Sequence, residues 1–130
     1  MIQMQTRNTV QRQIVLQTVQ TMRNHPTADA VYEAIRTVHP SISKATVYRN
    51  LHQLADQGKI QQISVPNGAD HFDSNMQNHY HVYCTHCGAV QDVYMRPIEN
   101  LLHLVEDSSG ATIQKYNILF EGICSGCQKA

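Results

Sequence analysis

Two pairs of cysteines with the same spacing restrict most strongly how this chain folds. Cys84 and Cys87 enclose two residues, and Cys124 and Cys127 repeat that spacing near the end of the 130-residue sequence. The first C-x-x-C pair is followed by Gly88, as in a tight turn that directs both sulfurs toward one point. Two C-x-x-C pairs together supply the four thiolates of a tetrahedral zinc site. The alternatives are disulfides or a redox pair. We expect structural zinc, because the sequence shows neither an export leader nor a thioredoxin-like βαβ pattern.

Histidines and aspartates form a second group of candidate ligands. His79 and His81 are two residues apart, so in a strand both face one side while Tyr80 faces the other. If the chain reverses at the first cysteine turn, the returning strand brings Asp92 opposite His81. Asp73 ends the preceding segment. Imidazole and carboxylate ligands suit Fe²⁺ or Mn²⁺ better than they suit structural zinc, so the pattern indicates a second metal site, with unrelated surface residues as the alternative.

Helical periodicity dominates the first part of the chain. Apolar residues recur at helical spacing over residues 6–24, after a cap at Thr27, and again between a cap at Ser43 and a stop at Gly58. His25 lies in the first break, where Pro26 holds it outside helical packing, and its membership of the metal group depends on the tertiary fold. The predicted buried positions are Val10, Ile14, Val15, Val19, Met22, Ala30, Val31, Ala34, Ile35, Val38, Val47, Leu51, Leu54 and Ala55.

Strand patterns follow the third helix. Ile60 to Asp73 reads as a hairpin with a turn at residues 66–68, and three helices followed by a hairpin is the order of a winged helix. The rest predicts strands at 80–84 and 89–94, a helix at 97–107, and strands at 111–116 and 118–123. The expected fold class is therefore α+β, with a winged helix-turn-helix domain over residues 1–73, a hinge at 74–78 and a small C-terminal α/β domain over residues 79–130.

Charge is unevenly distributed along a chain of zero net charge. Residues 1–49 carry six basic and two acidic side chains, a net of +4, and the remainder carries −4. The outer face of the third helix combines basic, hydroxyl and aromatic groups, which suits a DNA major groove, although an ordinary solvated helix is the alternative. Arg49 would engage guanine or a phosphate, Tyr48 a thymine methyl or a phosphate, and Lys44 a phosphate. The candidate DNA-binding residues are Lys44, Thr46, Tyr48, Arg49, His52 and Gln53.

The motifs resemble, in their order, those of the ferric uptake regulator family, over about residues 10–128. They are His25-Pro-Thr-Ala-Asp, Ala45-Thr-Val-Tyr-Arg-Asn-Leu51, Phe72-Asp73, His79-Tyr-His81 and the two C-x-x-C pairs. The chain looks most similar to the peroxide-sensing repressors, because iron-uptake repressors tend to carry Glu at positions 73 and 92. Arg49 departs from that subgroup, in which Asn is frequent, and puts the operator preference in question.

The resemblance implies a homodimeric, metal-dependent DNA-binding repressor. It assigns structural zinc to the four cysteines, and it implies that a homodimer forms through the C-terminal domain. It also implies peroxide sensing, with Fe²⁺-catalysed oxidation of His25 or His79, whereas Mn²⁺ would repress without sensing. The alternative is an iron- or manganese-responsive uptake repressor. The regulatory metal ligands that the resemblance implies are His25, Asp73, His79, His81 and Asp92.

Other function classes leave different signatures. The motifs of zinc deaminases and zincins are absent, and no glutamate stands near a histidine cluster to act as a general base, so we expect no enzyme. A metalloenzyme would lose turnover with the His/Asp group, and a zinc-ribbon interaction module would show no salt-dependent affinity for duplex DNA. Apolar stretches are too short to span a bilayer and the first residues lack a charged-then-apolar leader, so we expect a soluble, cytoplasmic protein.

Overall fold

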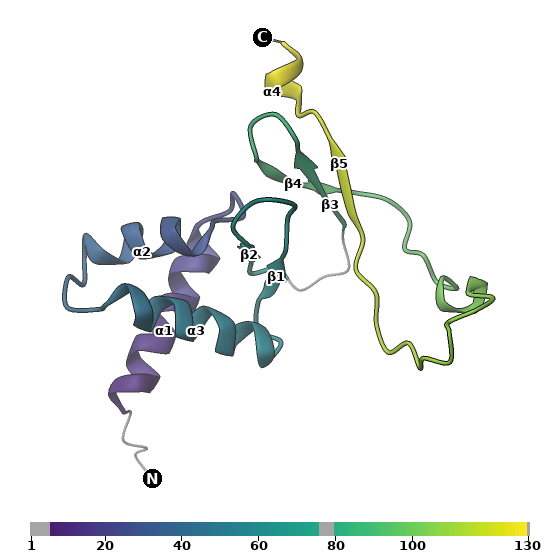
Figure 1. Cartoon of the computed structure of the whole chain (residues 1–130). Coiled ribbons are helices and arrows are strands. Elements are labelled where there is room, and N and C mark those ends of the chain that lie inside the picture. The colour runs from purple at the N-terminus through teal and green to yellow at the C-terminus, as the bar shows by residue number, and fades with distance from the viewer. Residues whose placement is uncertain (1–5, 76–79, 130) are drawn as a thin grey trace. The chain divides into compact units, whose positions relative to one another are not determined.

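The structure, a computed structural model, describes residues 6–75 and 80–129 of the chain. The chain divides into two compact units, Met1–Gln77 and Asn78–Ala130, called here the N-terminal unit and the C-terminal unit (Figure 1). Helices make up most of the first and a small sheet organises the second, so the α+β prediction is confirmed. None of the helices in the described ranges is long and apolar enough to cross a membrane. Most of the predicted hinge, and His79, lie outside the described residues.

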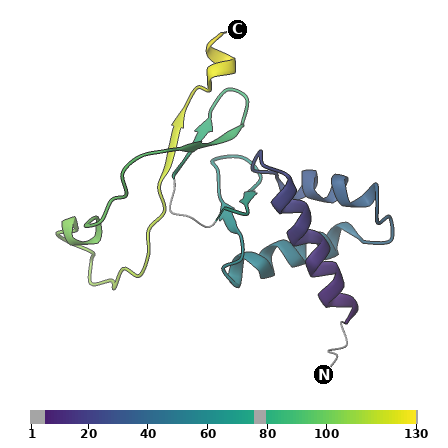
Figure 2. The same ribbon diagram turned by 180° about the vertical axis from the view of Figure 1, so that it is seen from behind.

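Each of the three helices of the N-terminal unit begins at a hydroxyl side chain. Thr6, Thr27 and Ser43 each accept a hydrogen bond from the backbone N–H three residues later, which satisfies an amide that the helix itself leaves unpaired. Gly58 follows the third helix with φ of +74°, as expected of a left-handed stop. All three predicted helices are confirmed (Figure 2). They are α1 (Arg7–Thr21), α2 (Ala28–Arg36) and α3 (Lys44–Asp56).

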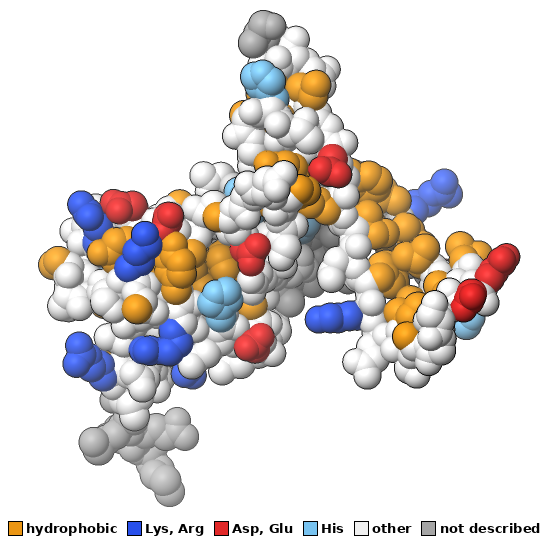
Figure 3. All heavy atoms as spheres, in the orientation of Figure 1, with side chains coloured by type: hydrophobic (Ala, Val, Ile, Leu, Met, Phe, Trp, Pro, Cys, Tyr) orange, Lys and Arg blue, Asp and Glu red, His pale blue; other side chains and the backbone are white. Residues whose placement is uncertain are grey.

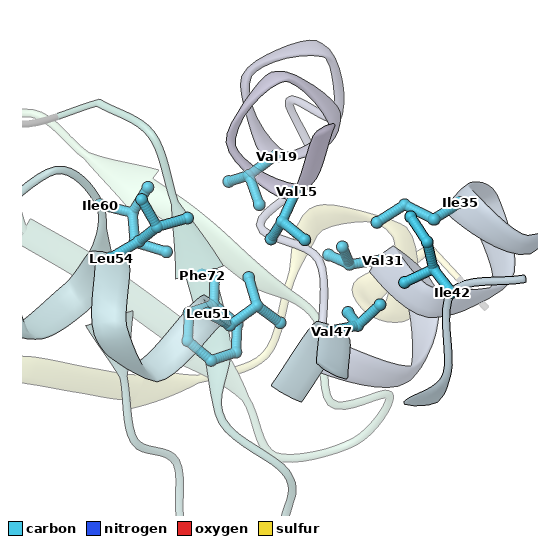
Figure 4. Close-up of a cluster of buried hydrophobic side chains, with 10 residues drawn as sticks. All are labelled: Val15, Val19, Val31, Ile35, Ile42, Val47, Leu51, Leu54, Ile60 and Phe72. Atoms are coloured by element: carbon cyan, nitrogen blue, oxygen red, sulfur yellow. The ribbon is translucent and has the colours of Figure 1, made fainter. Parts of the chain in front are cut away.

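Apolar side chains from all three helices meet in one core. Leu51 and Leu54 of α3 lie close to Phe72 and Ile60, as the close-up shows (Figure 4). The prediction was wrong at Val38, which lies beyond the end of α2 and is 71% exposed, because the helix stops before its next turn reaches the core. It was also wrong at Val10, in the first turn of α1, which is 40% exposed. The core residues are Val15, Val19, Val31, Ile35, Ile42, Val47, Leu51, Leu54, Ile60 and Phe72.

A two-stranded hairpin completes the N-terminal unit as its wing. Strands β1 (Gln61–Ile63) and β2 (His71–Asp73) pair antiparallel, with Gln62 opposite Phe72. The other edge of β2 bonds to the turn between α1 and α2, since the Phe72 N–H donates to the carbonyl of Pro26 at 2.8 Å. This pairing fixes the turn that carries His25 beside the end of β2.

The C-terminal unit is built on a three-stranded sheet with the order β4-β3-β5. Strand β3 (Tyr80–Cys84) pairs antiparallel with β4 (Val90–Val93) and parallel with β5 (Leu119–Gly122). His81 stands directly opposite Asp92, as the sequence predicts. A short helix, α4 (Ser125–Gln128), follows β5.

Two elements predicted in the C-terminal unit are absent from the structure. Residues 97–107 contain only a 3₁₀ turn, η1 (Leu102–Leu104), in place of a helix, and residues 111–116 form no strand. Two of the side chains that the predicted helix would turn inward have little to pack against within this unit: Leu102 is 39% exposed and Val105 is 42% exposed. Helical periodicity stabilises a helix only where its apolar stripe is buried. Figure 3 shows hydrophobic side chains gathered on this part of the surface.

Candidate metal centres and nucleic-acid interface

The four cysteines converge within the C-terminal unit. Cys84 and Cys87 lie on a tight turn closed by Gly88, whose φ is +81°, while Cys124 and Cys127 flank the start of α4. The Sγ atoms of Cys84 and Cys127 are 3.8 Å apart and those of Cys87 and Cys124 are 3.7 Å apart. These separations are too long for a disulfide. They match the edge of about 3.8 Å of a tetrahedron whose Zn–S bonds are about 2.3 Å, so the donor set fits zinc.

Backbone amides already favour one thiolate of this cluster. The N–H groups of Cys124 and Cys87 point at the Sγ of Cys84 from 3.3 and 3.4 Å. These hydrogen bonds, that from Cys124 first, lower the pKa of Cys84 to about 5. Hydrogen bonding to the side chain of Cys124, followed by burial, raises the pKa of Cys127 to about 12. A divalent cation bound among the four sulfurs would stabilise all of them as thiolates.

The N-terminal unit brings His25 and Asp73 together. The Nε2 atom of His25 lies 3.2 Å from the Oδ2 atom of Asp73, and both side chains are largely buried. His25 adopts φ of +55°, an uncommon value for a residue with a β-carbon. The Nδ1–H of His71 donates a hydrogen bond to the backbone carbonyl of His25 at 2.6 Å. Strand β2 therefore holds the backbone of this turn through His71 and the ring of His25 through Asp73.

The C-terminal unit contains a second pair of the same kind. The Nε2 atom of His81 on β3 lies 3.5 Å from the Oδ1 atom of Asp92 on β4. The His81 side chain is 6% exposed, although most of its strand is only half buried. Burying an imidazole beside a carboxylate is costly unless the two groups bond to each other or to a cation. Each pair offers one nitrogen and one oxygen donor, and both donor types suit Fe²⁺ and Mn²⁺. Each pair by itself supplies only two ligands.

The candidate DNA-binding residues lie along α3, but their exposure differs. Lys44, Arg49 and His52 are exposed, whereas Thr46, Tyr48 and Gln53 are half buried. Gln53 accepts a hydrogen bond at 3.3 Å from Arg12 of α1, and the Thr46 hydroxyl bonds to Ser43 at the helix cap. Lys44, Arg49 and His52 are therefore the more exposed candidates for contact with DNA.

Asp29 is a residue of this surface that the sequence analysis did not assign. Its carboxylate, in the first turn of α2, accepts a hydrogen bond from the Tyr48 hydroxyl and pairs with the Lys44 ammonium at 2.9 Å. Hydrogen bonding to Tyr48, followed by Lys44, lowers the pKa of Asp29, and hydrogen bonding to Asp29 raises the pKa of both Tyr48 and Lys44. The only sequence signal was an acid in the first turn of a helix, which is ordinary at that position.

Comparison with known proteins gives one consistent family. A model of the "Ferric uptake regulator family" matches residues 3–121. The peroxide-responsive repressor PerR of Staphylococcus aureus is 32% identical over 122 residues, which cover 94% of this chain and 82% of that protein.

Solved structures agree with this assignment. The Campylobacter jejuni peroxide stress regulator matches with a TM-score of 0.69 and 32% identity, covering 92% of this chain and 90% of that one. The ferric uptake regulator of Francisella tularensis, in a structure with iron, matches with a TM-score of 0.74 and 24% identity over 98% of both chains. The first likeness extends to sequence and fold, and the second to the fold.

Proposed function

Because this chain belongs to the ferric uptake regulator family of metal-responsive transcription regulators, which are not enzymes, we propose that it is a metal-dependent repressor whose ion joins its two units. The observation that carries the proposal is the repeated pair: His25 with Asp73 in the N-terminal unit, and His81 with Asp92 in the C-terminal unit. Each pair is an incomplete ligand set, whereas Fe²⁺ and Mn²⁺ take up to six ligands. Together with His79, the two pairs would make a five-ligand site.

The consequence of a shared site is control over the orientation of α3. His25 and Asp73 are fixed to the winged helix through the pairing of β2, and His81 and Asp92 are fixed to the sheet. When bound, the ion supplies the positive charge that holds these carboxylates and imidazoles together and, in the case of Fe²⁺, a redox centre that reacts with peroxide. Ligation from both units favours one arrangement of the winged helix over others, which is a population shift driven by differential affinity.

In a homodimer, the orientation of the two α3 helices would determine whether both can bind DNA. The exposed apolar side chains of residues 94–123 support a dimer interface, as do the open outer edges of β4 and β5 in the described sheet. In a two-fold dimer, two copies of α3 would enter successive major grooves, about 34 Å apart. The four cysteines would hold the dimerising unit together through structural zinc.

Peroxide is the signal that we propose for this repressor. Two observations support it: aspartate at positions 73 and 92, and 32% identity to a peroxide-responsive repressor. Addition of an oxygen atom to the imidazole of His25 or His79 would remove a ligand and with it the preference for the DNA-binding arrangement. Arg49 favours the second candidate, an iron- or manganese-responsive uptake repressor, because the peroxide-sensing repressors that the chain resembles frequently carry Asn at this position.

Metal-dependent DNA binding tests the repressor proposal. In a mobility-shift titration with Mn²⁺, we expect the wild type to bind its operator. We expect Asp92→Ala to lose this Mn²⁺-dependent binding while it keeps zinc and its oligomeric state. Glu99→Ala, which removes an exposed carboxylate of the same unit, is the matched control and should behave as the wild type. An unchanged Mn²⁺ requirement in Asp92→Ala would reject the ligand assignment.

Mass spectrometry separates the two signals. After treatment with Fe²⁺ and peroxide, a peroxide sensor should gain one oxygen atom on a peptide containing His25 or His79, and the same treatment with Mn²⁺ should leave the mass unchanged. Oxidation confined to methionines, with Fe²⁺-dependent DNA binding intact, would support the iron-responsive candidate instead.

A further inference from the structure

One carboxylate oxygen links the first turn of α2 to the first turns of α3. The Oδ1 atom of Asp29 accepts the hydroxyl proton of Tyr48 and lies 2.9 Å from the Nζ atom of Lys44. Lys44 and Tyr48 are four residues apart and therefore neighbours on the surface of α3, and the Nζ atom lies 5.7 Å from the centre of the Tyr48 ring. The three side chains thus form a closed contact, called here the Asp29 cluster.

Stability does not account for this cluster. The Lys44 and Asp29 side chains are 56% and 63% exposed, and ion pairs at such exposure contribute little to the free energy of unfolding. A carboxylate on a surface that meets DNA also repels phosphate and offsets the charge of Lys44, so it weakens the attraction that does not depend on sequence. The cluster therefore costs DNA affinity without a comparable gain in stability.

The cluster also decides what Tyr48 can offer to DNA. A phenol has a single hydroxyl proton, and here that proton is donated to Asp29. Donation to a phosphate would require the contact to break, whereas the ring stays available for apolar contact with a thymine methyl group. Of the two roles that the sequence left open for Tyr48, the Asp29 cluster favours the one that reads a base.

We propose, building on the repressor function above, that Asp29 is a positioning residue that makes operator recognition selective, by restraining Lys44 and directing Tyr48 toward bases instead of phosphates. Its loss should raise the affinity for arbitrary DNA and lower the preference for the operator. A residue that only stabilised the fold would lower both affinities together.

The test compares two duplexes for the full-length, zinc- and Mn²⁺-loaded protein. One is a duplex that the wild type enriches from a random-sequence pool, and the other has the same composition in scrambled order. For Asp29→Asn we expect binding to the scrambled duplex to strengthen about three- to tenfold, with a salt dependence steeper by about one phosphate contact. The ratio of the two affinities should fall about tenfold, as expected when one base contact is weakened.

Matched variants separate this effect from a change in net charge. Glu33→Gln removes a carboxylate of similar exposure on the same helix, one that pairs with Arg36 at 3.3 Å, and should leave the ratio of affinities unchanged. Tyr48→Phe removes only the hydroxyl and should lower the ratio, and combining it with Asp29→Asn should add little, because Asp29→Asn weakens the same contact that Tyr48→Phe removes.

Two results would overturn the inference. An Asp29→Asn ratio equal to that of the wild type, or an equal loss of affinity for both duplexes, would show that Asp29 does not set selectivity. If the wild type enriched no duplex from the pool and bound none in a salt-dependent way, the repressor function itself would fail and this inference with it.

Discussion

The Nδ1–H of His71 donates a hydrogen bond to the backbone carbonyl of His25 across 2.6 Å, although 46 residues separate them in the chain. The bond fixes a residue whose backbone has φ of +55°, a left-handed conformation that costs about 1–2 kcal/mol for a residue with a β-carbon. β2 thus supplies Asp73 as a ligand and also holds the neighbouring ligand in place.

Replacement of His71 tests this second role. We expect His71→Phe to weaken Mn²⁺ binding roughly tenfold, because a residue that hydrogen-bonds to a metal ligand holds that ligand in the orientation that the ion needs. His71→Gln, which keeps a donor, should recover part of the affinity. His39→Phe, at an exposed histidine of the same unit, is the control. Isothermal calorimetry measures the affinities, and equal values for His71→Phe and the wild type would contradict the prediction.

Loss of the cysteine cluster should unfold the C-terminal unit. We expect Cys84→Ser, or removal of zinc with a chelator, to abolish its cooperative unfolding transition, since structural zinc contributes on the order of 10 kcal/mol to folding. His86→Ala, inside the same C-x-x-C turn but exposed, should retain zinc. Circular dichroism and sedimentation follow the two outcomes. A Cys84→Ser protein that remained a folded dimer would argue against a structural role.

Two valines of the α2 region provide a matched test of the core. Val31 is fully buried and Val38 is 71% exposed. Val31→Ala should lower the free energy of unfolding of the N-terminal unit by about 2 kcal/mol, while Val38→Ala should change it by less than about 0.5 kcal/mol. Urea denaturation measures both changes. Similar values for the two variants would place Val38 in the core, as the sequence pattern first indicated.

The Asp29 cluster should be visible in a pH titration without DNA. Its hydrogen bond raises the pKa of Tyr48 above the ordinary 10.0 and lowers the pKa of Asp29 below 3.8, so the contact is fully formed between these values. It is lost as the pH rises through the tyrosine pKa or falls through the aspartate pKa. Difference ultraviolet spectra should show one tyrosine of Asp29→Asn ionising at a lower pH than in the wild type. Superimposable titration curves would contradict this.

The sequence by itself determined the elements that rest on local chemistry. Hydroxyl caps fixed the starts of α1, α2 and α3, because an unpaired amide is satisfied within one turn. The spacing of the two cysteine pairs predicted their convergence, and the reversal of the chain at the first cysteine turn predicted that Asp92 stands opposite His81. The helix caps and the His81–Asp92 pair span a single turn or hairpin, so the pattern contains their geometry. The two cysteine pairs are more distant in the chain, and the parallel pairing of β5 with β3 brings them together.

Only the tertiary structure decided the relationships between distant segments. His25 meets Asp73, and Asp29 meets Tyr48, because β2 pairs with the α1–α2 turn and α2 packs beside α3. Apolar periodicity predicted a helix over residues 97–107 that the chain does not form. A periodic stripe indicates which side chains could be buried together, whereas burial itself depends on a second surface, and the C-terminal unit offers little of one to these residues.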